Sequence, residues 1–183
     1  MTTRKSAFAP VVDAQTRVLI LGSLPGDMSL AAAQYYANPR NRFWHLIGEV
    51  IARPDLPQLD YDARLAALLS RGIGLWDAVA SAERPGSLDS AIRRAQPAAL
   101  ADLIASLPQL RAVAFNGQTS AKIARPLLRG LPLELIDLPS SSPAHAAMPI
   151  AQKQQTWLSL QQFIAPTRAP RLPCAANGRI ENP

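Results

Sequence analysis

Residues 18–50 read VLILGSLPGDMSLAAAQYYANPRNRFWHLIGEV, and this stretch decides the fold. The apolar run 17–22 has the length and composition of a buried strand. The turn Gly22–Gly26 follows with two glycines and a proline, and the segments 29–37 and 41–52 then have helical patterning. A strand that passes through a tight turn into a helix is the first half of a parallel α/β unit.

The rest of the chain repeats this alternation of strands and helices. Three further short apolar runs end in turn-forming residues, at 72–76, 112–116 and 133–138. Helical segments separate or follow them, at 61–71, 97–107, 117–129 and 150–164, and Pro126 is expected to kink or end the third of these. Because the strands are continuously apolar, both of their faces should be covered. The sequence therefore predicts an α/β fold, a three-layer α/β/α domain with a central four-stranded, mainly parallel sheet.

Length and composition fit one globular domain. The chain has 183 residues, of which 48% are apolar, and no apolar run reaches the roughly 18 residues of a membrane span. We expect a domain at 11–165 between a disordered N-terminus, 1–10, and a disordered, basic, Pro-rich tail, 166–183. The single cysteine, Cys174, lies in that tail, so no intrachain disulfide can form. With no apolar stretch of signal-peptide length near Met1, a cytoplasmic location is expected.

The charge favours a polyanionic partner. Lys and Arg outnumber Asp and Glu by 19 to 13, and only three of the basic residues are lysines. Arginine suits phosphate oxygens and base edges, and a positive field speeds encounter with nucleic acid. A GC-rich genome would also give an Ala-, Arg- and Pro-rich protein, so charge alone leaves nucleic-acid binding open.

Chemically useful residues follow all four predicted strands. They are the turn Gly22–Gly26, Asp77, the pair Asn116-Gly117, and the loop from Pro139 to His145. Because the carboxyl ends of parallel strands meet at one edge of the sheet, a single crevice can collect them. Taken alone, each could equally be an ordinary turn or cap.

Several classes of site are disfavoured by the residues present. The first turn has neither the G-x-G-x-x-G spacing of a dinucleotide site nor the G-K-[ST] of a P-loop. With only His45, His145 and a cysteine in the tail, a zinc site is not expected. Ser140, His145 and Asp77 could be imagined as a triad, but no G-x-S-x-G elbow supports it. What remains is amide and aromatic side chains beside a turn, which suit recognition of a flat heterocycle.

Four motifs in order carry a resemblance. They are GSLPG with YY and NPRNRFW behind it, GLWDAVASAERPGSLDSAI, AFNGQTSAK and LPSSSPAHA. In this order they resemble the uracil-DNA glycosylase superfamily, and most closely its hypoxanthine-DNA (deoxyinosine) glycosylase branch. The resemblance runs from about Val18 to the helix near Trp157 and implies the fold of that superfamily.

The resemblance also implies roles for individual residues. Asn41, in N-x-F-W, would be the catalytic residue that orients the attacking water, and Phe43 would stack on the flipped base. The base-binding residues implied are Gly22, Ser23, Leu24, Tyr36, Phe43, Asp77 and Asn116. The DNA-binding residues implied are Ser140, Ser141, Ser142, His145 and Lys122. Leu24 and Leu138 depart from the pattern, because relatives carry polar catalytic groups there.

Each role has a structural alternative. Asn41 could cap the helix that begins at Arg42, Asn116 the helix at Gly117, and Asp77 the end of its strand. Of the two adjacent tyrosines, which point in different directions on a helix, we expect Tyr36 to line the pocket. Phe43 and Trp44 could both lie in the core, and Trp44 is expected there, facing the sheet.

The function expected is removal of hypoxanthine from deoxyinosine in DNA. We predict a monofunctional enzyme that leaves an abasic site. We expect a monomer that uses no metal and no cofactor. Three alternatives stay open: excision of uracil or xanthine, a non-catalytic module that binds damaged DNA, and an enzyme that acts on free nucleosides.

Overall fold

The computed structural model describes residues 4–164, and its centre is the predicted parallel sheet. The strands are β2 (Val18–Gly22), β3 (Ile73–Asp77), β6 (Ala112–Asn116) and β7 (Glu134–Leu138), in the spatial order β3-β2-β6-β7. All three neighbouring pairs are parallel. Every residue of β2 is buried because this strand has a neighbour on each side and helices on both faces.

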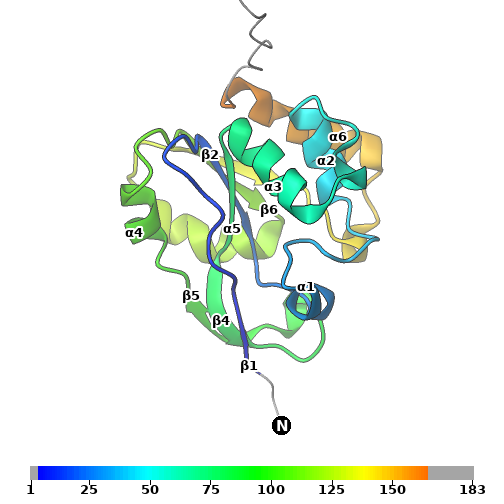
Figure 1. Ribbon diagram of the computed structural model, residues 1–183. Coiled ribbons are helices and arrows are strands. Elements are labelled where there is room, and N and C mark those ends of the chain that lie inside the picture. Colours follow the sequence, from blue (N-terminus) through cyan, green and yellow to red (C-terminus); the bar gives the residue numbers. More distant parts are fainter. Residues whose placement is uncertain (1–3, 165–183) are drawn as a thin grey trace, which may run out of the picture.

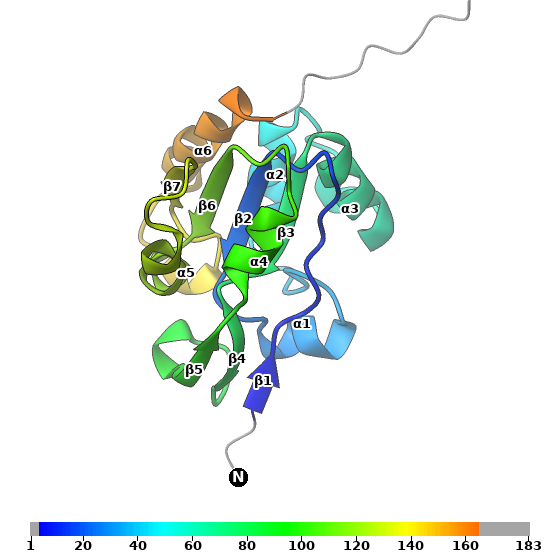
Figure 2. The same ribbon diagram turned by 90° about the vertical axis from the view of Figure 1, so that its left-hand side faces the viewer.

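Helices cover both faces of this sheet and make two separate apolar cores. On one face α2 (Phe43–Val50), α3 (Tyr61–Ser70) and α6 (Ile150–Leu158) pack against Val18 and Ile20. On the other face α4 (Leu100–Ala105) and α5 (Gln118–Ala124) pack against Leu19 and Leu21. Figures 1 and 2 show the three layers, and the predicted α/β/α fold is confirmed.

Helix ends follow local backbone rules. The first helix, α1 (Asp27–Ala32), is shorter than the expected 29–37 because Ala33 adopts a left-handed conformation with φ of 51°. Helix α5 ends before Pro126, and a 3₁₀ turn, η3 (Arg125–Leu128), replaces its last part as expected. The other 3₁₀ turns are η1 (Leu56–Gln58), η2 (Asp89–Ala91), η4 (Pro143–His145) and η5 (Ser159–Gln162).

A second, antiparallel sheet was not predicted. It consists of β1 (Arg4–Ser6), β4 (Val79–Glu83) and β5 (Arg93–Pro97), in the order β1-β4-β5, and lies beyond the carboxyl end of the central strands (Figure 2). Two expectations are corrected by it. Residues 4–10 are not disordered, because β1 pairs with β4, and the helix expected at 97–107 begins only at Leu100, because Pro97 ends β5.

The remaining expectations on organisation concern the tail and membranes. The predicted disordered tail, 166–183, lies outside the described residues. Among residues 4–164, no helix has both the length and the apolar character needed to cross a bilayer.

Candidate active site at the carboxyl edge of the sheet

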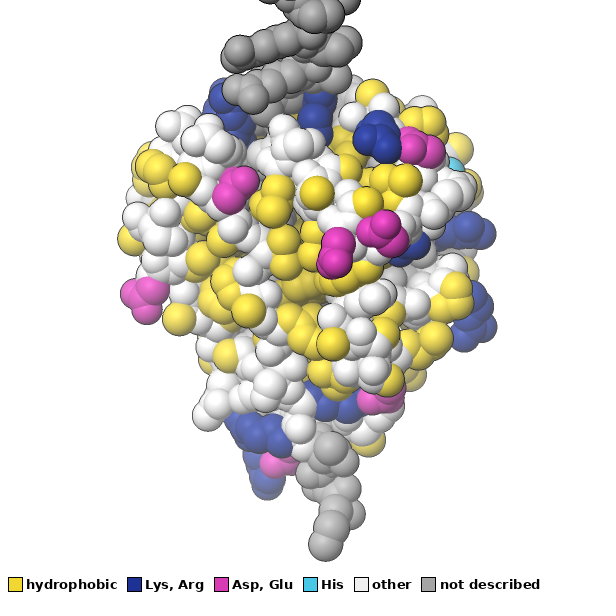
Figure 3. Space-filling view, viewed as in Figure 1, with side chains coloured by type: hydrophobic (Ala, Val, Ile, Leu, Met, Phe, Trp, Pro, Cys, Tyr) yellow, Lys and Arg dark blue, Asp and Glu magenta, His cyan; other side chains and the backbone are white. Residues whose placement is uncertain are grey.

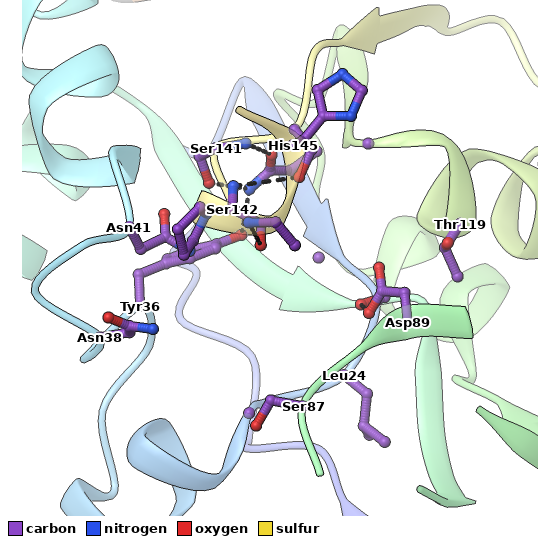
Figure 4. Close-up of a pocket in the computed structure, with 18 of the residues that line it drawn as sticks. Leu24, Tyr36, Asn38, Asn41, Ser87, Asp89, Thr119, Ser141, Ser142 and His145 are labelled. Carbon is purple, nitrogen blue, oxygen red and sulfur yellow. Dashed lines mark hydrogen bonds between the residues drawn. The ribbon is translucent and has the colours of Figure 1, made fainter. Parts of the chain in front are cut away.

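A cavity of about 1080 Å³ opens at the carboxyl edge of the central sheet. It is walled by the turn after β2, the loop between α1 and α2, the connection between β4 and β5, the start of α5 and the loop after β7. In Figure 4, Tyr36 and Asn41 lie on one side of this hollow, and Asp89 and Thr119 lie on the opposite side. Segments that are far apart in sequence therefore meet in one crevice, as predicted from the strand ends.

Gly22 ends β2 where the chain passes closest to Asp77. A Cβ atom on Gly22 would lie 2.6 Å from Asp77 Oδ1 and 3.3 Å from the Tyr36 hydroxyl. Any side chain would therefore displace two groups that line the cavity. This close approach explains why the first motif has a glycine at position 22.

Asp77 is a buried carboxyl group in the cavity wall. Its side chain is 4% exposed, and its Oδ2 has no hydrogen-bond partner among the described residues. Burial raises the pKa of Asp77 to about 7, and Asp89 adds to this rise, while the positive charge of Arg84 opposes it. Asp77 can therefore be a neutral hydrogen-bond donor at a pH where ordinary carboxyl groups are ionised.

Asn41 bonds the start of α2 and also lines the cavity. Its Oδ1 accepts a hydrogen bond of 2.9 Å from the backbone N–H of Phe43, in the first turn of α2. The same half-buried side chain lines the cavity. Capping therefore fixes the amide at the cavity wall and does not turn it away.

Tyr36, and not Phe43, is the aromatic wall of the cavity. The two rings are stacked with centroids 3.7 Å apart and an interplanar angle of 9°. Phe43 is fully buried and packs edge-on against Trp44 and Trp157. The expectation that Phe43 itself contacts a base does not fit this arrangement, because the Tyr36 ring covers its face; Phe43 supports Tyr36 from behind. Trp44 lies in the core, as expected.

Asn116 bridges two walls of the cavity and caps no helix. Its Nδ2 donates to Tyr36 Oη at 3.2 Å and to Ser141 Oγ at 2.9 Å, and its Oδ1 accepts from Ser141 N at 2.9 Å. Burial and the charge of Asp77 raise the pKa of the Tyr36 hydroxyl above its usual value, and the hydrogen bond from Asn116 opposes this rise. Asn116 thereby fixes the loop after β7 to the aromatic wall.

Of the predicted DNA-contacting residues, the three serines make hydrogen bonds within the loop after β7 or to its neighbours, and the two basic residues are exposed. Ser141 is buried against Asn116, Ser140 Oγ accepts from Ser142 N, and Ser142 Oγ accepts from Ala144 N. His145 is exposed at the rim of the cavity. Lys122 is exposed on α5, outside the cavity lining.

The two leucines that depart from the superfamily pattern are both buried. Leu138 is 3% exposed and belongs to the core beneath α2 and α6. Leu24 is 5% exposed and packs with Val79 and Ala82 of the second sheet. Ser23 Oγ beside it donates to Asp89 Oδ1 at 2.6 Å.

Three polar residues of the site were missed in the sequence. Arg84 and Asp89 lie in the segment ERPGSLD of the second motif, and no residue of that segment was assigned a role. Lys153 is buried on α6 and donates to the carbonyl oxygens of Ser140 and His145, both at 2.7 Å. No sequence signal distinguished Lys153, because its partners are backbone atoms of another segment. In residues 4–164, no group of three or more His, Cys, Asp or Glu side chains could hold a metal ion.

Comparison with known proteins decides the family. The family model of the uracil DNA glycosylase superfamily matches residues 9–161. The chain belongs to the uracil DNA glycosylase superfamily. The resemblance, the fold and the DNA glycosylase class predicted from the four motifs are confirmed.

Relatives within the superfamily support the predicted branch. A protein of Methanosarcina barkeri named hypoxanthine DNA glycosylase is 42% identical over 142 residues, which are 78% of this chain and 89% of the relative. A protein of the same name from Methanosarcina acetivorans is 42% identical over 141 residues, 77% of this chain and 88% of the relative. The solution NMR structure of a proposed uracil DNA glycosylase from Methanosarcina acetivorans superimposes with a TM-score of 0.79 at 37% identity, over 88% of this chain and 99% of that one.

Proposed function

We propose that this protein is a monofunctional glycosylase that excises hypoxanthine from deoxyinosine in DNA. The observation that carries the proposal is the capped amide of Asn41 beside the Tyr36 ring, in a cavity whose wall holds Asp77. The two relatives named hypoxanthine DNA glycosylase support the choice of base. The proposed setting is a monomer in the cytoplasm that acts without metal or cofactor.

The lesion would enter the cavity as a nucleotide flipped out of the duplex. Extrusion costs a few kcal/mol, and this cost is lowest for a mispaired base, which aids selection of deaminated purines. The purine would stack on the outer face of Tyr36, which Phe43 backs at 3.7 Å. Gly22 would let the backbone approach the base and sugar closely.

Asn41 would orient the water that attacks C1′. A carboxamide oxygen can accept two hydrogen bonds, and Phe43 N–H occupies only one position on Asn41 Oδ1. A water that donates to the second position turns its own lone pair toward the sugar. The amide dipole also favours the positive charge that develops on the sugar.

Asp77 would assist the departing base. In its protonated form it can donate to the O6 or N7 acceptor of hypoxanthine, whereas adenine presents an amino group in place of O6. Hydrolysis transfers the hydroxyl of water to C1′ and breaks the bond to N9. The remaining proton of the water passes through solvent to the released purine.

An abasic site is the expected product. None of the three lysines of the chain lines the cavity, so no lysine amine is placed to form a Schiff base with the sugar. Strand cleavage should therefore require subsequent alkali. Cleavage without alkali would contradict the monofunctional mechanism.

The test is a panel of duplexes with hypoxanthine, xanthine, uracil or a G·T mismatch at one position. Hypoxanthine should be released fastest in single-turnover reactions followed by alkali. Uracil belongs in the panel because the NMR neighbour is a proposed uracil DNA glycosylase. Faster release of uracil or xanthine would overturn the assignment of the base, and tight binding without any release would indicate a non-catalytic module.

A further inference from the structure

The loop Gly22–Asp27, against which the base and sugar would lie, is held by the connection between β4 and β5. Ser23 Oγ donates to Asp89 Oδ1 at 2.6 Å, and Asp27 N donates to Ser87 Oγ at 2.9 Å. The side chain of Leu24 is buried among apolar residues of the second sheet, Val79, Ala82 and Ile92.

Arg84 makes the deepest of these contacts. Its side chain is 1% exposed, the least exposed of any charged residue described, and it lies in the cavity wall. Its guanidinium donates to the Leu24 carbonyl oxygen at 3.0 Å and to the Pro25 carbonyl oxygen. A planar fork is suited to holding two adjacent carbonyl groups, and the buried charge is compensated by Asp89 Oδ1 at 3.5 Å.

Arg84 and Asp89, both from the β4–β5 connection, are also the charged groups that act on Asp77. Burial raises the pKa of Asp77, the positive charge of Arg84 lowers it, and the negative charge of Asp89 raises it. Asp77 Oδ1 and the Tyr36 hydroxyl meet beside Gly22, at 2.6 and 3.3 Å from the position that a Cβ atom would take there, whereas the Tyr35 hydroxyl donates to the Ala9 carbonyl oxygen at 3.2 Å. The pKa of Asp77 therefore responds to two opposite charges of the β4–β5 connection in addition to burial.

We infer that Arg84 is a positioning residue for base excision: it fixes the backbone of Leu24 and Pro25 beneath the flipped nucleotide. This inference rests on the proposed function. It gives the β4–β5 connection a part in the reaction, although no residue of it needs to contact the reacting atoms.

The test compares Arg84→Met, Arg84→Lys and Asp89→Asn. The ionisation of Asp77 is followed by ¹³C NMR of its carboxyl group, and single-turnover excision of hypoxanthine is measured from pH 5 to 9. Arg84→Met removes the positive charge and should shift the Asp77 titration and the alkaline limb of the rate to higher pH. Asp89→Asn should shift both to lower pH, while its Oδ1 can still accept from Ser23.

Arg84→Lys tests the loop contact separately. It keeps the charge but replaces the planar fork with a compact ammonium on a shorter side chain, which does not reproduce the geometry of the two contacts, so the rate should fall about tenfold or more with the pH profile nearly unchanged. Amide hydrogen exchange in 22–27 should become faster. Arg129→Met is the matched control, because Arg129 is exposed and precedes the opposite, amino end of β7; it should change neither the rate nor the profile.

The outcomes separate this inference from the proposed function. If the wild type excises hypoxanthine and the Arg84 and Asp89 variants keep its rate and pH profile, the inference is wrong and the function stands. If the wild type releases no base, the function is wrong, and the exchange of 22–27 still tests the positioning role. Should Arg84→Met fail to fold, Arg84→Lys tests the loop contact by the same exchange measurement.

Discussion

Asp77 is a cavity residue whose protonation near neutral pH differs from that of an ordinary carboxyl group. Burial raises the pKa of its carboxyl group from 3.8 to about 7, so the group ionises within the range in which the enzyme would work. A protonated Asp77 can donate a hydrogen bond to the departing purine, whereas the carboxylate can only accept. Excision should therefore depend on pH through this single group.

We predict that the single-turnover rate on deoxyinosine duplex falls as pH rises through about 7. In Asp77→Asn the side-chain amide remains a donor at every pH, so this alkaline limb should disappear. The measurement is the pH profile of both proteins between pH 5 and 9. A wild-type rate that is flat over this range, or an equal decline in Asp77→Asn, would contradict the role of Asp77.

The same pKa shift predicts how stability depends on pH. Because the folded-state pKa is raised, the stability associated with the neutral carboxyl group is full below about pH 4 and is lost as pH rises to about 7. At pH 8 Asp77→Asn should raise the free energy of unfolding by up to about 4 kcal/mol, and near pH 4 it should have little effect. Urea denaturation at the two pH values measures this difference. Equal effects of Asp77→Asn at both pH values would show that folding does not raise the pKa of Asp77.

The stacked rings of Tyr36 and Phe43 form the aromatic wall on which the base is proposed to stack. Tyr36→Ala should lower the excision rate by at least tenfold, because the base loses the ring on which it would stack. Tyr36→Phe keeps the ring and loses only the hydroxyl that accepts from Asn116, so it should stay within a few fold of the wild type. Single-turnover rates at saturating enzyme distinguish the two, and equal losses would assign the effect to the hydroxyl group.

At the scale of elements, the sequence predicted the parallel sheet because its strands are short, continuously apolar and separated by helices. It did not predict the antiparallel sheet. Strand β5 is exposed along its whole length and reads RRAQP, with neither alternation nor branched residues, and β1 has only three residues. These strands form because β4 continues almost directly from β3, with only Ala78 between them, and offers two edges to pair with.

The candidate site was predictable where a residue type carries chemistry at a strand end. Asp77 was found in this way, whereas Asn41 was assigned from the resemblance and Tyr36 was chosen as one of two adjacent tyrosines; all three line the cavity. Phe43 was misplaced because sequence order does not tell which of two stacked rings lies in front. Arg84 and Lys153 could not be recognised because they bind backbone carbonyl groups, which every residue has.

Lys153 should support the loop after β7. Its ammonium group is the donor to two carbonyl groups of that loop, so Lys153→Met would leave both without this partner. We predict a loss of about 2 kcal/mol in the free energy of unfolding and faster amide exchange in 139–145. The exposed Lys122→Met is the control and should alter neither. Unchanged exchange in Lys153→Met would show that the loop is held by Asn116 and Ser141 alone.

For the whole molecule, the excess of 19 basic over 13 acidic residues matches a substrate that is a polyanion. In Figure 3, some Lys and Arg side chains lie at the end of the molecule where the second sheet lies, and others lie along the right-hand side and at the opposite end. Arg4, Arg93 and Arg94 are exposed residues of the second sheet. Part of the basic surface is therefore exposed beyond the same edge of the central sheet at which the cavity opens.

We predict that affinity for duplex DNA falls steeply with salt, with a slope in log Kd against log salt of about 0.9 for each phosphate contacted. The single-turnover rate at saturating enzyme should change little, because the chemical step follows binding. Fluorescence anisotropy with a labelled duplex measures the slope. Salt-independent binding together with release of hypoxanthine from free deoxyinosine would indicate an enzyme of nucleosides instead.

Asn41 gives the most direct test of the whole account. Asn38 is its matched control, because it also lines the cavity and its Oδ1 accepts from a backbone N–H two residues further on, that of Arg40, at 3.0 Å. Either alanine variant loses such a turn bond, but only Asn41 is proposed to hold the attacking water.

The decisive measurement is the single-turnover rate of hypoxanthine release from deoxyinosine duplex by the wild type, Asn41→Ala and Asn38→Ala, each with its free energy of unfolding. The account predicts that Asn41→Ala lowers the rate by about a hundredfold or more, while Asn38→Ala, with a similar loss of stability, stays within a few fold of the wild type. A rate retained in Asn41→Ala, or lowered equally in both variants, would contradict the account and leave Asn41 as a helix cap only.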